Sequence, residues 1–245
     1  MLVAGFPSAA FGTNVYVVAP APGEECVVVD PGIEVVEGVE ALIAEHRLRP
    51  VAVLLTHGHL DHTFSVRPVT GAHDVPAYIH PDDEELLADP MKGMGPQTRA
   101  MFGDSLEWQE PDDVRVLADG EVLELAGLEL TVDHAPGHTP GSVMFRVAGA
   151  PDGVSGLDIT PGQTVLSGDV LFAGAIGRTD LPGGSFDQML TSLATKVLPL
   201  PDDCLVLPGH GPATTIGQER AANPFLAQVD PTRSVDAAVR GGRWT

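Results

Sequence analysis

A short apolar run that leads directly into four potential metal ligands constrains this chain more than any other feature. The run at 51–55 is continuously apolar, which is typical of a strand buried on both faces. The segment Thr56–His62, with the sequence Thr-His-Gly-His-Leu-Asp-His, follows at once. A buried strand that ends in such residues indicates a functional site at the edge of a sheet.

The spacing within this segment suits a metal centre. In extended chain, His57 and His59 lie two residues apart and point to the same side, so they can bind one ion together. Asp61 and His62 follow as the chain turns, and they can face a neighbouring ion. Imidazole and carboxylate groups are common ligands of zinc, iron and manganese. The segment therefore predicts a metal site.

Three further ligand-type residues lie on tight loops at the ends of expected strands. His138 lies within the turn Ala135–Ser142, His210 follows the last strand within Leu207–Pro212, and Asp169 ends the segment Ser-Gly-Asp at 167–169. Rigid loops of this kind hold ligands in a preorganised geometry. We expect all three residues to join the histidines of the first segment.

Turn signals and hydrophobic periodicity predict a chain of many short elements without repeats or linkers, and we interpret residues 1–245 as a single domain. The segment 89–113 contains several methionines without a clean period, so it is either a lid or substrate wall or an insertion packed on the core. A surface loop is expected at 148–162 and a hairpin-like series at 114–133. Strands are expected at 14–19, 26–30, 51–55, 77–79, 114–117, 121–125, 128–133, 142–147, 164–166 and 205–207, and helices at 34–46, 82–88, 186–197 and after 214.

Composition excludes several classes of partner. The net charge of −21, from 13 basic and 34 acidic residues, disfavours binding to nucleic acids and to anionic membranes. Cys26 and Cys204 both lie in apolar runs, which indicates buried strand residues rather than a disulfide. The first twenty residues lack Lys and Arg, and no apolar run approaches the roughly 20 residues of a membrane span. We therefore expect a cytoplasmic protein that binds neither nucleic acids nor membranes.

The order of the candidate ligands resembles the signature of the metallo-β-lactamase superfamily, over the range from Asp30 to His210. The resemblance implies an αββα sandwich, in which two mixed sheets are flanked by helices and two divalent metal ions lie at one edge between the sheets. Zinc is the expected metal, with iron or manganese as alternatives. By this match, the first ion would be held by His57, His59 and His138, and the second by Asp61, His62 and His210, with Asp169 bridging the two.

Two details indicate a branch of the superfamily. Class B β-lactamases commonly carry a cysteine in or near the position of Asp169, and this chain has none there. The segment Leu171–Asp180 resembles the one that follows the bridging aspartate in glyoxalase II-like thioesterases and persulfide dioxygenases. Its Arg-Thr-Asp ending is similar to that of the short, single-domain glyoxalase II relatives of bacteria. Only 35 residues follow His210, too few for the helical C-terminal domain that helps standard glyoxalase II to bind glutathione.

This resemblance implies hydrolysis of a hydroxyacyl thioester, such as S-lactoylglutathione, through a metal-bound hydroxide. A thiolate is a good leaving group because a free thiol has a pKa of about 8.5, so no strong general acid is required. Asp169 and Asp61 would be the catalytic residues, Asp169 as the bridging ligand and Asp61 as a ligand that also orients the hydroxide.

Several residues near the ligands have expected supporting roles. Arg178 would bind a substrate carboxylate, or it would form a structural pair with Asp180. Asp30 and Thr56 would accept hydrogen bonds from ligating histidines, although Asp30 also fits a turn former before Pro31. The four histidines outside the pattern are expected not to bind metal, and His80 is the one expected to line the pocket; these are His46, His73, His80 and His134.

Other functions remain as alternatives at this point. A persulfide dioxygenase has the same fold and motifs but uses one iron, held at the positions equivalent to His57, His138 and Asp169. A lactonase or another hydrolase could use the same metal pair. An RNA-processing nuclease conflicts with the acidic charge, and a binding module without metal conflicts with the complete set of ligands.

Overall fold

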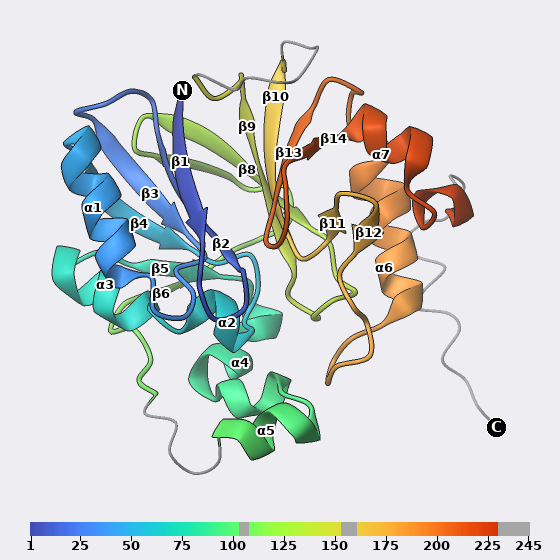
Figure 1. Ribbon diagram of the computed structural model, residues 1–245, viewed down its shortest axis with the longest axis horizontal. Helices are drawn as coiled ribbons and strands as arrows, with labels where there is room; N and C mark the ends of the chain where they lie inside the picture. The colour runs from blue at the N-terminus through green and yellow to red at the C-terminus, as the bar shows by residue number, and fades with distance from the viewer. Residues whose placement is uncertain (103–107, 153–160, 230–245) are drawn as a thin grey trace.

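Two six-stranded sheets form the centre of the computed structural model, which describes residues 1–102, 108–152 and 161–229 (Figure 1). The first sheet consists, in spatial order, of β1 (Leu2–Pro7), β2 (Asn14–Ala19), β3 (Glu25–Val29), β4 (Arg49–Leu54), β5 (Ala77–Ile79) and β6 (Val114–Val116). The second consists of β14 (Thr214–Thr215), β13 (Leu205–Pro208), β10 (Gln163–Gly168), β9 (Val143–Ala148), β8 (Leu128–His134) and β7 (Val122–Leu125). A separate hairpin is formed by β11 (Leu171–Phe172) and β12 (Ala175–Ile176).

Both sheets are mixed. In the first sheet, β3 to β6 run parallel to one another, whereas β2 pairs antiparallel with both of its neighbours, β1 and β3. In the second, β10 and β13 are parallel and the remaining pairs are antiparallel. Parallel strands require crossover connections, which here are mostly helices on the outer faces of the sheets.

Helices cover the outer face of each sheet (Figure 1). The first sheet packs against α1 (Val36–His46) and α3 (Val66–His73), and the second against α6 (Phe186–Ser192) and α7 (Ile216–Ala222). A π-helical turn at Leu193–Val197 continues α6. The layers are therefore helix, sheet, sheet and helix, and the predicted αββα sandwich is confirmed.

The alternation of side chains along the strands explains these layers. In β3, Val27 and Val29 face the second sheet, whereas Cys26 and Val28 face the helices. All four are buried, and burying each such valine stabilises the fold by roughly 1.5–3 kcal/mol. Side chains from both sheets, such as those of Leu54 and Phe145, form one core between the layers.

The expected strands and helices are found, with one correction and several unexpected elements, among them α3 and β14. The series at 114–133 is not one hairpin, because β6 pairs in parallel with β5 in the first sheet while β7 and β8 pair in the second. The chain crosses between the sheets at 117–121, and a local pattern carries no information on such a crossing. Strand β1 and the β11–β12 hairpin were not expected, since both are short or lie at an edge.

Short helices occupy the region between β5 and β6. A 3₁₀ turn (Pro81–Asp83) leads into α4 (Glu84–Ala88), and a second 3₁₀ turn (Pro90–Gly93) precedes α5 (Pro96–Phe102). Parts of the predicted segments 89–113 and 148–162 lie outside the described residues. Among the helices of the described ranges, none combines the length and apolar character needed to cross a membrane.

Candidate metal centre

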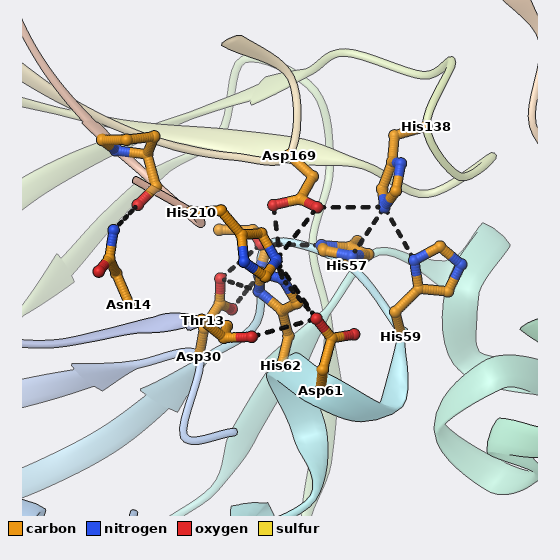
Figure 2. A network of polar contacts seen from close by, with 12 residues as sticks. Thr13, Asn14, Asp30, His57, His59, Asp61, His62, His138, Asp169 and His210 are labelled. Carbon is orange, nitrogen blue, oxygen red and sulfur yellow. Dashed lines mark hydrogen bonds and ion pairs between the residues drawn. The ribbon is translucent and has the colours of Figure 1, made fainter. Parts of the chain in front are cut away.

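The seven predicted ligands meet at one edge of the sandwich, and strands of both sheets supply them (Figure 2). The end of β4 leads to His57 and His59, and the short helix α2 (Leu60–Thr63) then carries Asp61 and His62. The other three come from the second sheet, since His138 lies between β8 and β9, Asp169 follows β10 and His210 follows β13.

Three imidazole nitrogens form a first group. His138 Nε2 lies 3.2 Å from His57 Nε2 and 2.8 Å from His59 Nδ1. All three side chains are buried. Two nitrogens bound to one tetrahedral zinc ion at about 2.0–2.1 Å would lie roughly 3.3 Å apart, so the group has the dimensions of a metal site.

A second group combines two histidines with a carboxylate. His210 Nε2 lies 3.3 Å from both His62 Nε2 and Asp61 Oδ2. The distance between His62 Nε2 and Asp61 Oδ2 is 3.6 Å. Thr13 Oγ1 donates a hydrogen bond of 3.1 Å to Asp61 Oδ2 and fixes its orientation.

The carboxylate of Asp169 lies between the two groups. Its Oδ1 is 3.4 Å from His62 Nε2, and its Oδ2 is 3.5 Å from His138 Nε2 and 3.6 Å from His210 Nε2. Although Oδ1 is buried, it accepts no hydrogen bond from any residue within the described ranges. A buried carboxylate oxygen without a donor is costly, and a cation would compensate it. The donor set therefore fits two divalent ions with Asp169 between them.

Hydrogen bonds on the far side of the imidazoles select the tautomer that suits a metal. His62 Nδ1 donates to Asp30 Oδ2 at 2.9 Å, and His138 Nδ1 donates to the carbonyl oxygen of Arg178 at 2.7 Å. Thr56 Oγ1 donates to Asp30 Oδ2 at 2.6 Å, so it accepts from His57 Nδ1 at 3.1 Å. In all three histidines the lone pair of Nε2 then faces the centre of the site.

Asp30 is both a turn residue and a hydrogen-bond acceptor for a candidate ligand histidine, the two roles expected from the sequence. Its backbone has φ +50°, as expected of a turn residue, and its side chain is buried. Its carboxylate also accepts hydrogen bonds from the backbone N–H of Thr56 (2.8 Å), the hydroxyl of Thr56 and the ring of His62.

Electrostatics differ between the two groups. Burial and the neighbouring imidazoles hold the pKa of His57 well below its ordinary value and lower that of His59 to about 3. Burial also acts to lower the pKa of His62, but Asp169, Asp61 and Asp30 outweigh it and raise this pKa to about 10. His57 and His59 thus offer neutral nitrogens, and the second group attracts positive charge through its carboxylates.

Two glycines allow the chain to approach the site closely. A Cβ atom at Gly209 would collide with Asp169 Oδ1 and with the ring of His62. Gly168 has φ +47°, and a Cβ atom there would collide with the side chain of Thr56. Larger residues at either position would push ligands apart.

Both groups open into a cavity of about 450 Å³. Part of the segment predicted to be a lid or wall, including Met94, lines this cavity and therefore forms a wall. Arg178 also lines it, but its exposed guanidinium forms two hydrogen bonds with Asp180, at 2.7 and 2.8 Å. The apolar residues of the wall are Phe11, Ile33, Leu60, Met94, Phe172, Ile176 and Leu181.

The remaining described histidines lie away from the two groups. His80, expected in the pocket wall, does not line the cavity; its ring stacks on that of His134 with a centroid distance of 3.9 Å. These rings are nearly parallel, at 11°. Ligand-type atoms of His80, Asp82 and His134 lie within 4.8 Å of one another, but His134 Nε2 already donates a hydrogen bond of 2.8 Å to the carbonyl oxygen of Pro140. His73 pairs with Glu40 at 2.8 Å.

Sequence reasoning missed two side chains that hold ligands or their loops. Thr13 contacts Asp61 across 48 residues of chain, and the buried Asp83 contacts both histidine loops of the first group. Neither has a local signal, because Thr13 precedes an ordinary strand and Asp83 lies in an acidic run that resembles a helix start.

Comparison with known proteins agrees with the geometry. Residues 9–156 match the family model described as the metallo-β-lactamase superfamily. The chain belongs to the metallo-β-lactamase superfamily. A member from Haemophilus influenzae, named hydroxyacylglutathione hydrolase GloC, is 36% identical over 81% of this chain and 86% of its own length.

Two solved structures are similar to this chain over nearly their whole lengths. The B3 metallo-β-lactamase BLEG-1 has a TM-score of 0.76 and 35% identity, covering 92% of this chain and 99% of that one. TTHA1623, described in a di-iron-bound form, has a TM-score of 0.71 and 38% identity, covering 91% and 100%. The ligand groups of this chain and the di-iron neighbour together fit a site for two metal ions.

Proposed function

We propose that this protein is a metal-dependent hydrolase that cleaves thioesters of the hydroxyacyl-thiol type. The observation that carries the proposal is the pair of converging donor groups with Asp169 between them, open to a cavity. The similarity to a hydroxyacylglutathione hydrolase supports the choice of substrate class.

The residues present could hold two divalent ions, the first through His57, His59 and His138, the second through Asp61, His62 and His210, with Asp169 shared. A metal pair supplies hydroxide near neutral pH and polarises the carbonyl group that is attacked. We assign to Asp61, whose carboxylate is fixed by Thr13 and lines the cavity, the orientation of the attacking water. The departing thiolate requires no proton donor from the protein.

The apolar wall of the cavity has two roles in this proposal. Side chains such as Phe172 and Leu181 exclude bulk water beside the donor groups, which strengthens electrostatic interactions there. They also provide contact area for the acyl or thiol part of the substrate.

Arg178 is the proposed partner of a substrate carboxylate. We expect Arg178→Ala to raise KM roughly two- to fivefold for a thioester with a carboxylate, since an exposed ion pair contributes little energy, and to leave kcat nearly unchanged. Steady-state kinetics with S-lactoylglutathione measure this effect, and Arg99→Ala, another exposed arginine, is the control. An unchanged KM would mean that Arg178 serves only to pair with Asp180.

The proposed activity is tested by following thioester loss from S-lactoylglutathione, with a parallel measurement of oxygen uptake in the presence of glutathione persulfide. We expect metal-dependent thioester cleavage that a chelator stops and added metal restores, without oxygen uptake. Oxygen uptake with persulfide and no thioester loss would instead identify an iron-dependent persulfide dioxygenase. Loss of a lactone substrate alone would identify a lactonase.

A further inference from the structure

Asp83 is a buried carboxylate that belongs to neither donor group. It ends the 3₁₀ turn after β5, immediately before α4, and its exposed fraction is 0%. Burial raises the pKa of its carboxyl group, which is the expected penalty for removing a carboxylate from water. A side chain retained at such a cost requires compensating contacts.

Those contacts are made with the two loops that carry the first group. Asp83 Oδ2 accepts a hydrogen bond of 2.8 Å from the backbone N–H of Gly58, the residue between His57 and His59. The same oxygen accepts a bond of 2.6 Å from the hydroxyl of Thr139, which follows His138. Asp83 Oδ1 accepts a bond of 2.7 Å from the backbone N–H of Gly141.

The fit around this carboxylate is close. A Cβ atom at Gly141 would lie 2.6 Å from the carboxylate carbon of Asp83, and one at Gly58 would lie 3.0 Å from its backbone oxygen. The two loops belong to different sheets, since His57 and His59 follow β4 and His138 follows β8. One carboxylate therefore joins the two halves of the first group directly.

We propose that Asp83 is a positioning residue that sets the distance between the loop of His57 and His59 and the loop of His138, and thereby the affinity of the first group for its cation. The inference rests on the proposed metal site. None of the hydrogen bonds of the Asp83 carboxylate reaches Asp61, His62 or His210, so we expect the second group to keep its geometry when Asp83 is changed. A change in the zinc affinity of the first group alone therefore distinguishes this role from a general contribution to stability.

Asp83→Asn is the variant to test, because it keeps the shape but places an amide N–H₂ where one carboxylate oxygen accepts a hydrogen bond. Each group is measured alone in a background that disables the other. In His210→Ala protein, we expect Asp83→Asn to weaken zinc binding by the first group about 10- to 100-fold, the usual effect of losing a residue that orients ligands. In His59→Ala protein, we expect zinc binding by the second group to be unchanged. Competition with a chromophoric chelator on the full chain measures both affinities.

Glu219→Gln is the matched control. Glu219 is also buried and accepts three hydrogen bonds, from Thr214 Oγ1 (2.6 Å), Gly174 N (2.8 Å) and Asn223 Nδ2 (2.8 Å), but none of these residues lies in a loop of the first group. We expect this variant to keep the zinc affinity of the first group even where it lowers the melting temperature.

The proposal would be overturned if Asp83→Asn weakened zinc binding equally in both groups, or if it changed the zinc affinity of neither. If Asp83→Asn does not fold, Thr139→Val can replace it, because this variant removes one of the three hydrogen bonds. Thr139→Val should weaken zinc binding by the first group alone, and by a smaller factor. An unchanged zinc affinity of the first group would then overturn the proposal. Because zinc binding is measured without substrate, a protein that binds zinc as expected but cleaves no thioester would contradict the proposed function and leave the role of Asp83 intact.

Discussion

Asp169→Ala is expected to abolish hydrolysis and to reduce bound metal while leaving the fold in place. The side chain contacts His62 in one group and His138 in the other, so its loss affects both cations. Metal ions stabilise transition-state charge by several kcal/mol, which corresponds to a fall in kcat/KM of roughly 10³-fold or more. Kinetics, metal content and circular dichroism of the purified variant measure the three parts of the prediction.

His57→Ala should give the same result, because it removes a nitrogen from the first group. Asp133→Asn is a suitable control, since Asp133 is another buried aspartate of the second sheet whose side chain pairs with Arg146. This control should lower stability and retain metal. Near-normal turnover in Asp169→Ala or His57→Ala would show that the site is assigned wrongly.

Asp30→Ala is expected to have the second largest effect, on stability and on metal affinity together. The change removes the acceptor for the backbone N–H and hydroxyl of Thr56 and for the ring of His62. Leaving a buried donor unpaired costs about 1–3 kcal/mol, so we expect the loss of three such bonds to lower the free energy of unfolding by about 3 kcal/mol or more. For a chain of this size, that corresponds to a fall in melting temperature of roughly 6–12 °C.

Metal affinity should fall about 10- to 100-fold in the same variant, because His62 loses the partner that fixes its tautomer. Thermal unfolding with and without added zinc separates the two effects, since saturating zinc restores only the part due to weaker binding. Thr56→Ser keeps the hydroxyl group and should behave like the unchanged protein. A melting temperature and a zinc affinity within error of the unchanged protein would contradict the contacts described for Asp30.

The ligand residues could be predicted because their signals are local. The motif around His57 and His59 follows a recognisable buried strand, and His138 and His210 lie in turns marked by Pro and Gly. Each signal needs only a few neighbouring residues. Their shared position at strand ends led us to expect that they meet, and the resemblance to a known family implied which ligands share an ion, since no local pattern specifies how distant strand ends come together.

The residues that support the ligands could not be predicted in this way. Asp83 is 56 residues from Thr139, and Thr13 is 48 residues from Asp61, so each contact depends on the finished packing of the sandwich. The parallel pairing of β6 with β5 likewise depends on the packing of the whole sandwich. Periodicity identifies the face of a strand, but the order of strands depends on how both sheets bury their apolar faces together.

Each donor group takes atoms from both sheets, and metal binding across this division would link metal supply to the lifetime of the protein. A cation bound by His57 and His138, or by His62 and His210, would oppose separation of the two sheets, so its binding free energy would add to the free energy of unfolding. Opening between the sheets exposes backbone to proteases, and the rate of cleavage follows the population of the open form. In a cell short of the metal, molecules of this protein would then be degraded as well as inactive, and their abundance would follow the metal concentration.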